Sequence, residues 1–266
     1  MKKIYTVRNV FQQQTHLWDK HTIAEEVAAC SRRNIRVTFL KYLPKDEPIL
    51  EAGCGLGAWV IYLSEKGYDI AGIDNNEAVI EQLKAWNPSL KVMYGDIRKL
   101  PYDDNSLGAY ISLGVVEHFE EGCGEAMKEA YRVLRPGGLV FLTVPMNNIF
   151  RKAFAHHIRS LYLFWSRLRN NPAFFAEYRY SRRETEELLK KYGFDPVFST
   201  WDDFDRADMS LGLWADFPPL QSPKLYRLNL PGRLAAVVLN STSRWTSAAG
   251  VFCLARKRRE ESNEFS

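Results

Sequence analysis

A glycine-rich stretch at residues 49–59, Ile-Leu-Glu-Ala-Gly-Cys-Gly-Leu-Gly-Ala-Trp, constrains the fold of this 266-residue chain most strongly. Glu51 precedes Gly53, Gly55 and Gly57, and an amphipathic helical pattern follows them. Glycines allow a sharp backbone turn and bring bare N–H groups close to a ligand. The stretch therefore predicts a buried strand, a tight turn and the start of a helix, arranged around a ligand.

Two classes of ligand are compatible with such a turn. The spacing of Gly53, Gly55 and Ala58 fits the dinucleotide fingerprint, with Asp74 about 20 residues later to hold ribose hydroxyls. Glu51 favours the other class. A carboxylate at the end of the first strand repels a diphosphate but tolerates a ligand that carries an ammonium and a sulfonium.

Strands and helices alternate through the following residues. A strand at 69–73 ends at Asp74, and Asn75 or Asn76 is suited to cap the next helix. The helix over 123–134 ends at Leu-Arg-Pro-Gly-Gly, because proline and glycine turn the chain. This alternation predicts an α/β fold with a doubly wound parallel sheet. The other predicted strands are residues 90–94, 107–113, 139–144, 194–200 and 250–255.

These motifs resemble those of one enzyme family. The acid two residues before Gly-x-Gly-x-Gly is similar to motif I of the class I S-adenosylmethionine-dependent methyltransferases. The string at 134–138 and Tyr-Ser-Arg-Arg-Glu at 180–184 resemble later parts of its small-molecule subgroup. The resemblance implies a Rossmann-like, seven-stranded, mostly parallel sheet with an antiparallel last strand. It also implies S-adenosyl-L-methionine as the cofactor and S-adenosyl-L-homocysteine as its product.

The resemblance further implies roles for single residues. The glycines admit the methionine part of the cofactor, Glu51 anchors its charged end, and Asp74 binds the ribose. Asp96 accepts the adenine amino group and Ile97 offers its N–H, although a turn aspartate that holds its own loop is the alternative. Cys54 is expected to fill a small slot. The expected cofactor-binding residues are Glu51, Gly53, Cys54, Gly55, Gly57, Asp74, Asn75, Asp96, Ile97 and Leu113.

The stretch Gly-Val-Val-Glu-His-Phe at 114–119 follows the fourth predicted strand. A similar apolar stretch ending in Glu-His in many small-molecule methyltransferases implies that His118 lies near the reacting methyl group. Histidine suits a general base for a hydroxyl or amine acceptor near neutral pH. The alternative is a local hydrogen bond, since methyl transfer from a sulfonium can proceed by positioning alone.

Residues 146–180 form an insertion with nine aromatic residues, six basic residues and one acid. In the family an insertion here builds the acceptor pocket or a lid, so Arg159, Arg167 and Tyr178 are expected to contact an anionic acceptor. Contact of residues 149–170 with an anionic membrane surface, or with single-stranded nucleic acid, is also compatible with this composition. The plainer alternative is an amphipathic helix with core aromatics and solvated arginines.

The remaining segments have less specific patterns. Residues 1–48 predict an arm, whose His16 or Trp18 either covers the ligand or anchors the arm, and a helix over 22–43. Residues 201–248 predict a second helical insertion with solvated or capping aspartates and no metal site. The methyltransferase domain is expected to span 49–256, and residues 257–266 to form a disordered tail.

The cysteines and the length of the apolar runs indicate where in the cell the protein is located. The four cysteines are scattered, no signal peptide is visible, and no apolar run is long enough to span a bilayer. We therefore expect reduced thiols and a cytoplasmic protein. The net charge of +4 gives no strong nucleic-acid signal.

The sequence thus predicts a methyltransferase that acts on an anionic small-molecule, lipid-type or sugar-type acceptor by direct displacement in a closed, dry site. One alternative is a NAD-dependent oxidoreductase. Another is a non-catalytic S-adenosylmethionine-binding or membrane-surface adaptor. A nucleic-acid methyltransferase is disfavoured, because Leu-Gly-Val-Val stands at 113–116 in place of an Asn/Asp-Pro-Pro-aromatic tetrad. The acceptor, its reacting atom and the oligomeric state do not follow from the sequence.

Overall fold

The computed structural model describes residues 1–7 and 22–259. Its central sheet has the strand order β4-β3-β2-β5-β6-β9-β8, and β9 is antiparallel to both of its neighbours. The predicted seven-stranded α/β fold with an antiparallel last strand is confirmed. The strands are β2 Ile49–Ala52, β3 Ile70–Asp74, β4 Val92–Tyr94, β5 Leu107–Leu113, β6 Leu134–Pro145, β8 Phe194–Asp202 and β9 Gly250–Lys257.

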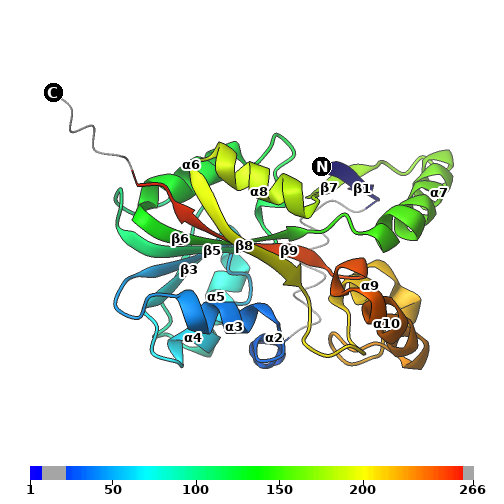
Figure 1. The fold of residues 1–266 in the computed structure, drawn as a ribbon, viewed down its shortest axis with the longest axis horizontal. Coiled ribbons are helices and arrows are strands. Elements are labelled where there is room, and N and C mark those ends of the chain that lie inside the picture. The colour runs from blue at the N-terminus through cyan, green and yellow to red at the C-terminus, as the bar shows by residue number, and fades with distance from the viewer. Residues whose placement is uncertain (8–21, 260–266) are drawn as a thin grey trace.

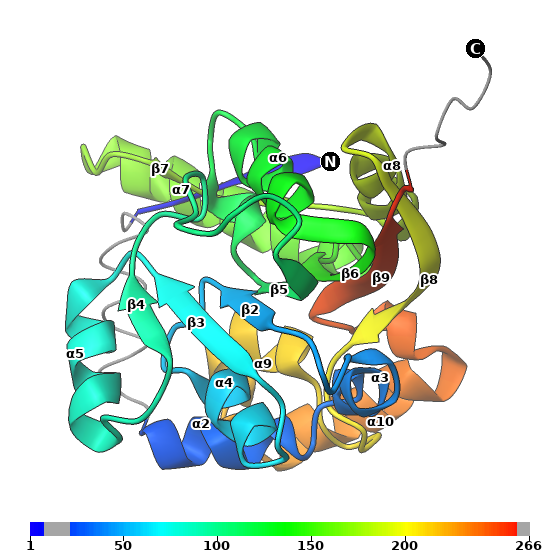
Figure 2. The same ribbon diagram turned by 90° about the vertical axis from the view of Figure 1, so that its left-hand side faces the viewer.

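Helices cover both faces of the sheet (Figure 1). Figure 2 shows α6 and α8 on one face and α2, α3, α4 and α5 on the other. Every residue of β2 is buried between these layers, as expected for a central parallel strand. The helices are α2 Ile23–Cys30, α3 Ile35–Tyr42, α4 Ala58–Ser64, α5 Glu77–Trp86, α6 Gly124–Val133 and α8 Arg182–Lys191.

The helix predicted over residues 22–43 is instead two helices, α2 and α3. Between them, Asn34 donates from Nδ2 to the carbonyl oxygen of Trp201, and Arg33 forms an ion pair with Asp202 at 2.6 Å. These contacts with the end of β8 interrupt the helix, and local periodicity carries no information about them. His16 and Trp18 lie outside the described residues.

Several strand boundaries also differ from prediction, for example β4, which begins two residues later, and β8, which ends two residues later. Strand β6 begins at Leu134, where it pairs with Leu107, and residues 135–138 bulge out before pairing resumes. Strand β9 runs to Lys257, two residues beyond the predicted strand. Residues 260–266 of the predicted tail lie outside the described part of the chain.

The first insertion contains a strand as well as helix. A π-helical turn, η2 (Arg151–Ala155), leads into α7 (His156–Leu168), and β7 (Phe174–Arg179) follows. Strand β7 pairs antiparallel with β1 (Lys2–Thr6) at the N-terminus, in a separate two-stranded sheet. This pairing does not follow from the sequence, because its two strands are far apart in the chain and each is short.

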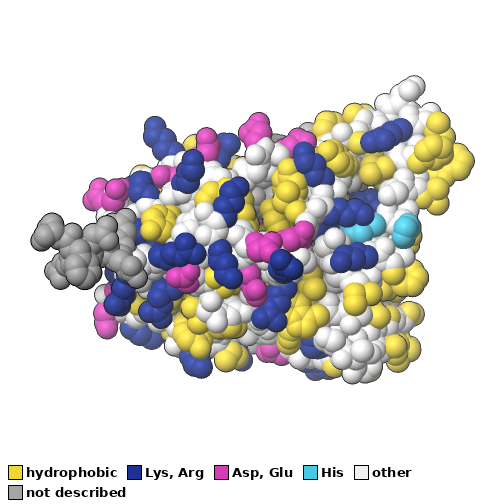
Figure 3. Space-filling view, turned by 45° about the horizontal axis from the view of Figure 1, so that its top comes forward, with side chains coloured by type: hydrophobic (Ala, Val, Ile, Leu, Met, Phe, Trp, Pro, Cys, Tyr) yellow, Lys and Arg dark blue, Asp and Glu magenta, His cyan; other side chains and the backbone are white. Residues whose placement is uncertain are grey.

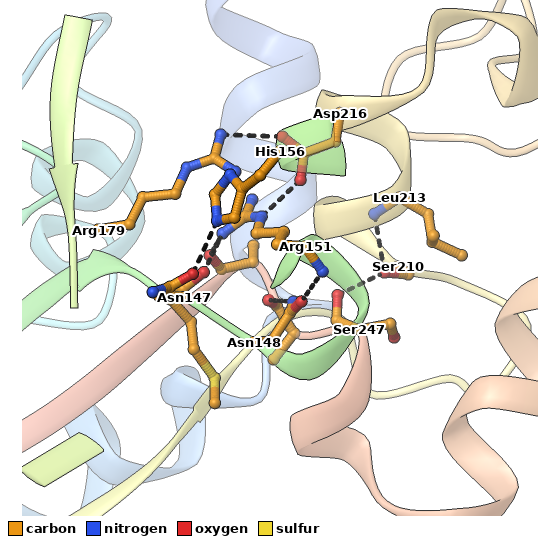
Figure 4. A network of polar contacts seen from close by, with 12 residues as sticks. Asn147, Asn148, Arg151, His156, Arg179, Ser210, Leu213, Asp216 and Ser247 are labelled. Atoms are coloured by element: carbon orange, nitrogen blue, oxygen red, sulfur yellow. Dashed lines mark hydrogen bonds and ion pairs between the residues drawn. The ribbon is translucent and has the colours of Figure 1, made fainter. Parts of the chain in front are cut away.

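The second insertion is bound to the first. It comprises α9 Leu211–Asp216, η3 Pro218–Leu220, α10 Leu230–Thr242 and η4 Arg244–Thr246. Asp216 accepts hydrogen bonds from Arg151 Nε and, at 2.9 Å, from Arg179 Nη2 (Figure 4). Although burial opposes it, these two guanidinium groups lower the pKa of Asp216 to about 2. The rings of Phe150 and Phe217, 5.2 Å apart, add an apolar contact.

Candidate functional site

A cleft of about 510 Å³ lies at the carboxyl ends of the parallel strands, where open α/β sheets bind their ligands. The turn after β2, the ends of β3, β5 and β6, helix α2 and the second insertion contribute to its wall. The predicted site residues that line it are Glu51, Gly53, Cys54, Gly55, Asp74, Asn75, Asp96, Ile97, Leu113 and His118. Gly57 precedes α4 and does not line the cleft.

The turn after β2 requires glycine for two reasons. Gly53, Gly55 and Gly57 have φ angles of +81°, +49° and +65°, which disfavour a side chain. A Cβ on Gly53 would also lie 2.4 Å from a methyl group of Val115, and one on Gly57 would lie 2.9 Å from Leu83. The glycines therefore let the turn pack closely against its neighbours.

The N–H groups of this turn bond within the protein, in contrast to the expectation that they reach a ligand. Gly53 and Cys54 both donate to the carbonyl oxygen of Ile73, at 2.7 and 3.0 Å. Gly55 donates to Oδ2 of Asp74 at 2.8 Å. A diphosphate is held by free N–H groups at such a turn, so this arrangement counts against a dinucleotide.

Glu51 lies where a phosphate would otherwise meet the start of α4. Its side chain is buried, and Oε2 accepts the N–H of Val60 at 3.1 Å. A helix N-terminus favours negative charge, and here the protein supplies that charge itself. Burial, with a smaller contribution from the negative charge of Asp74, raises the pKa of Glu51 to about 8. A cationic ligand group beside Glu51 would stabilise the charged form.

The other predicted cofactor contacts come from the ends of β3 and β4. Asp74 accepts the N–H groups of Gly55 and Asn76, and burial raises its pKa. Asn76 caps α5, and each carboxylate oxygen of Asp74 retains a lone pair for a ligand hydroxyl. Asp96 is ion-paired with Arg98 at 2.6 Å, which matches the alternative of an aspartate that holds its own loop, so the adenine contact stays a prediction.

His118 lies beside a buried acid, Glu117, that the sequence analysis did not select. Nδ1 of His118 is 2.7 Å from the carbonyl oxygen of Ala176, which can only accept, so neutral His118 carries its proton on Nδ1 and accepts at Nε2. Nε2 lies 4.0 Å from Oε1 of Glu117. Glu117 lines the cleft, its Oε2 lacks a hydrogen-bond partner among the described residues, and burial raises its pKa to about 7. The Glu-His pair identified this position in the sequence, but the sequence did not show which of the two side chains is buried.

The three expected substrate residues do not line the cleft. Arg159 points to Asp216, with 3.9 Å between Nη2 and Oδ1. Arg167 is exposed on α7. The hydroxyl of Tyr178 donates to the carbonyl oxygen of Glu120 at 2.8 Å. Arg159 and Tyr178 therefore contact Asp216 and Glu120, and neither is part of the cleft wall.

The cleft wall is acidic, which bears on the expected anionic acceptor. Of the described residues that line it, one is a lysine or arginine, Arg33, and Asp202 already neutralises that residue. An acidic wall attracts cations and repels anions, so an anionic acceptor lacks a cationic partner in this part of the wall. The acidic lining residues are Glu26, Glu51, Asp74, Asp96, Glu117 and Asp202.

Cys54 is suited to packing rather than to chemistry. Burial raises the pKa of its thiol, with further contributions from Glu51 and Asp74, so the thiol stays protonated. Across residues 1–7 and 22–259, no cluster of three or more His, Cys, Asp or Glu side chains is arranged to hold a metal ion. None of the helices in these ranges is long and apolar enough to cross a membrane.

Comparison with known proteins matches a large part of the chain segment that builds this cleft. Residues 50–142 match the family model of a methyltransferase domain. The chain is 33% identical over 143 residues to the demethylmenaquinone methyltransferase of Staphylococcus epidermidis, a match that covers 50% of this chain and 58% of that protein. The chain spans about half the length of the curated relatives it matches.

Two solved structures share the fold. A SAM-dependent methyltransferase from Methanosarcina mazei has a TM-score of 0.57 and 17% identity, with 84% of this chain and 98% of that chain covered. The geranyl diphosphate C-methyltransferase of Streptomyces coelicolor, solved with S-adenosyl-L-homocysteine, has a TM-score of 0.53 and 14% identity, with 83% and 76% covered. At these identities the likeness concerns the fold alone.

The substitution Glu51→Gln should stabilise the ligand-free protein increasingly as pH rises from about 4.5 to about 8. Over this range an unfolded glutamate releases its proton while folded Glu51 keeps it, so wild-type folding becomes less favourable. Glutamine still accepts the N–H of Val60 without titrating. Urea unfolding should show a gain of a few kcal/mol at the upper end of the range, at about 1.4 kcal/mol per pKa unit, and no gain at its lower end.

Glu81→Gln, on the exposed side of α5, is the control and should change the free energy of unfolding by less than about 0.5 kcal/mol at either pH. Equal stability of Glu51→Gln and wild type at the upper pH would contradict the assignment of Glu51 as a buried carboxyl without a compensating charge.

Proposed function

We propose that this chain, a member of the class I S-adenosylmethionine-dependent methyltransferase family, transfers the methyl group of S-adenosylmethionine to a small-molecule acceptor. The observation that carries the proposal is the buried Glu51 carboxylate at the start of α4, in an acidic cleft. We assign the catalytic domain to residues 49–256 and a cytoplasmic location to the protein, whose four cysteines are free and buried.

The described residues fit the cofactor by charge and by donor type. Glu51 would receive the ammonium group of the methionine part, and Asp74 would accept the ribose hydroxyls with its remaining lone pairs. Ile97, which is buried beside the end of β4, would offer its backbone to the adenine. Bound S-adenosylmethionine supplies an electrophilic methyl group. The chain holds the acceptor in line with that group and keeps water out.

The acceptor we propose is a small, uncharged or lipid-like molecule. The name of the Staphylococcus epidermidis relative describes a demethylmenaquinone methyltransferase, and that of the Streptomyces coelicolor structure describes a geranyl diphosphate C-methyltransferase. Both names describe small organic acceptors, and the diphosphate in the second is negatively charged, so the names support the size of the acceptor and not its charge. The acidic lining of the cleft favours an acceptor without negative charge.

His118 is the proposed general base. As the acceptor atom bonds to the methyl carbon, the carbon–sulfur bond breaks and the acceptor loses a proton. Nε2 of His118 carries the free lone pair, and His118 lines the cleft, so Nε2 would take that proton. The Glu117 carboxyl group would then stabilise the imidazolium.

A labelled-methyl assay tests the proposed function. The protein and S-adenosylmethionine with a tritiated methyl group are incubated with cell extract divided into small-molecule, lipid, protein and nucleic-acid fractions. We expect label in the small-molecule or lipid fraction. Label confined to protein or nucleic acid would overturn the acceptor class. Tight cofactor binding without label in any fraction would favour the adaptor alternative.

The substitution His118→Ala should lower kcat by about 100-fold or more with an acceptor found in that assay, because a positioned general base contributes about that much. His118→Gln is the matched variant, since it can keep a hydrogen bond to Ala176 without acting as a base. Activity rescued by glutamine would assign His118 a positioning role, and near-wild-type turnover of both variants would exclude a role as base.

A further inference from the structure

Helix α7 and the turn η2 before it expose a stripe of large apolar side chains that the rest of the described chain does not cover. Phe154, Ile158, Leu161, Trp165 and Leu168 recur at the spacing of one helical face. Each of the five is 55–62% exposed. The neighbouring Ile149, Tyr162 and Phe164 are also exposed, so the helix presents an almost continuous apolar surface.

Helix α10 carries a second such stripe. Leu230, Leu234, Val237 and Val238 lie on one helical face and are 44–68% exposed. The opposite side of α10 packs on α9 through Ala236 in a small core. The two stripes and the three residues beside the first make twelve large exposed apolar residues, well beyond the scattered single residues of an ordinary surface.

Both stripes belong to segments that lack acidic residues. Residues 149–176 and 217–249 contain no Asp or Glu. They contain nine lysines and arginines, which are Arg151, Lys152, Arg159, Arg167, Arg169, Lys224, Arg227, Arg233 and Arg244. Figure 3 shows hydrophobic and basic side chains at the right-hand end of the molecule, with no acidic side chain in view there.

The buried polar network around Asp216 connects the two insertions that carry the stripes. Asp216 ends α9, and its partners Arg151 and Arg179 come from the first insertion (Figure 4). Because both guanidinium groups and the carboxylate are buried, this link is less screened by solvent than a surface ion pair. Helices α7 and α10 both lie toward the same end of the long axis (Figure 1).

We infer that this end of the molecule, residues 149–168 with 230–238, docks on the surface of a membrane that contains anionic lipids. Aromatic and aliphatic side chains on a helix enter the boundary between head groups and acyl chains, and basic side chains around them attract anionic head groups. The helices lie on the bilayer and do not span it.

Charge favours a membrane over a second copy of the chain as the occupant. Arg151 and Arg159 face Asp216, and Arg233 pairs with Asp208. The exposed basic residues of these segments with no ion pair among the described residues are Lys152, Arg167, Arg169 and Lys224. A symmetric dimer through this end would bring two copies of this positive charge together, and like charges repel. An anionic lipid surface supplies the missing negative charge. The inference does not depend on methyl transfer, although it would bring the protein to the phase that holds lipid-like acceptors.

Vesicle flotation tests the inference. The full chain is mixed with vesicles of phosphatidylcholine alone, or of phosphatidylcholine with phosphatidylglycerol. We expect binding to the mixed vesicles that weakens as salt is added, because exposed charges are screened. Trp165→Glu and Leu234→Glu should each lower the partition coefficient by about tenfold or more, since each removes apolar contact and adds a repelled charge.

Trp86→Glu is the matched control. Trp86 ends α5 and is 48% exposed, against 55% for Trp165, so this variant should bind like the wild type. Thermal melts should show that all three variants fold. Absence of binding to mixed vesicles, or equal binding of Trp165→Glu and wild type, would overturn the inference. A wild-type dimer in light scattering that Trp165→Glu dissociates would assign this surface to a second copy instead.

Discussion

The architecture of the cleft depends on one buried carboxylate, Glu51, held at the N-terminus of α4 by the N–H of Val60. It takes the position at which a phosphate would meet the helix, and the N–H groups of Gly53, Cys54 and Gly55 bond to β3 rather than to a ligand. Burial without a positive partner disfavours the charged form of Glu51. A cationic ligand group beside Glu51 would supply that missing partner. This feature separates a cofactor with an ammonium group from a dinucleotide more clearly than the glycine spacing does.

The strands, the glycine turn and the ends of most helices followed from sequence because they are set by local chemistry. Positive φ angles at Gly53, Gly55 and Gly57 and the capping box of Ser181 and Glu184 are examples. The break between α2 and α3, the β1–β7 pairing and the direction of Arg159 did not follow, because each is decided by a partner distant in sequence. Glu117 was missed for the same reason, since its burial depends on packing around the end of β5.

The two insertions contact each other through the buried polar residues around Asp216, while apolar residues on α7 and α10 remain exposed. In an ordinary soluble helix the apolar face is the one that is buried, whereas here the buried apolar core of Leu213, Leu228 and Ala236 is small and the stripes are exposed. The aromatic and basic composition of residues 146–180 is compatible with an acceptor lid, a membrane surface, single-stranded nucleic acid or an amphipathic helix. Arg159, Arg167 and Tyr178 do not line the cleft, so these three residues do not support the lid.

The most direct test of the central role of Glu51 is a calorimetric titration of the ligand-free protein with S-adenosylmethionine and, in parallel, with NADH. The account predicts binding of S-adenosylmethionine alone. It also predicts that Glu51→Gln weakens this binding by roughly 10- to 100-fold, the value of a hydrogen bond between charged groups. Binding of NADH with comparable affinity, or unchanged affinity of Glu51→Gln for S-adenosylmethionine, would contradict it.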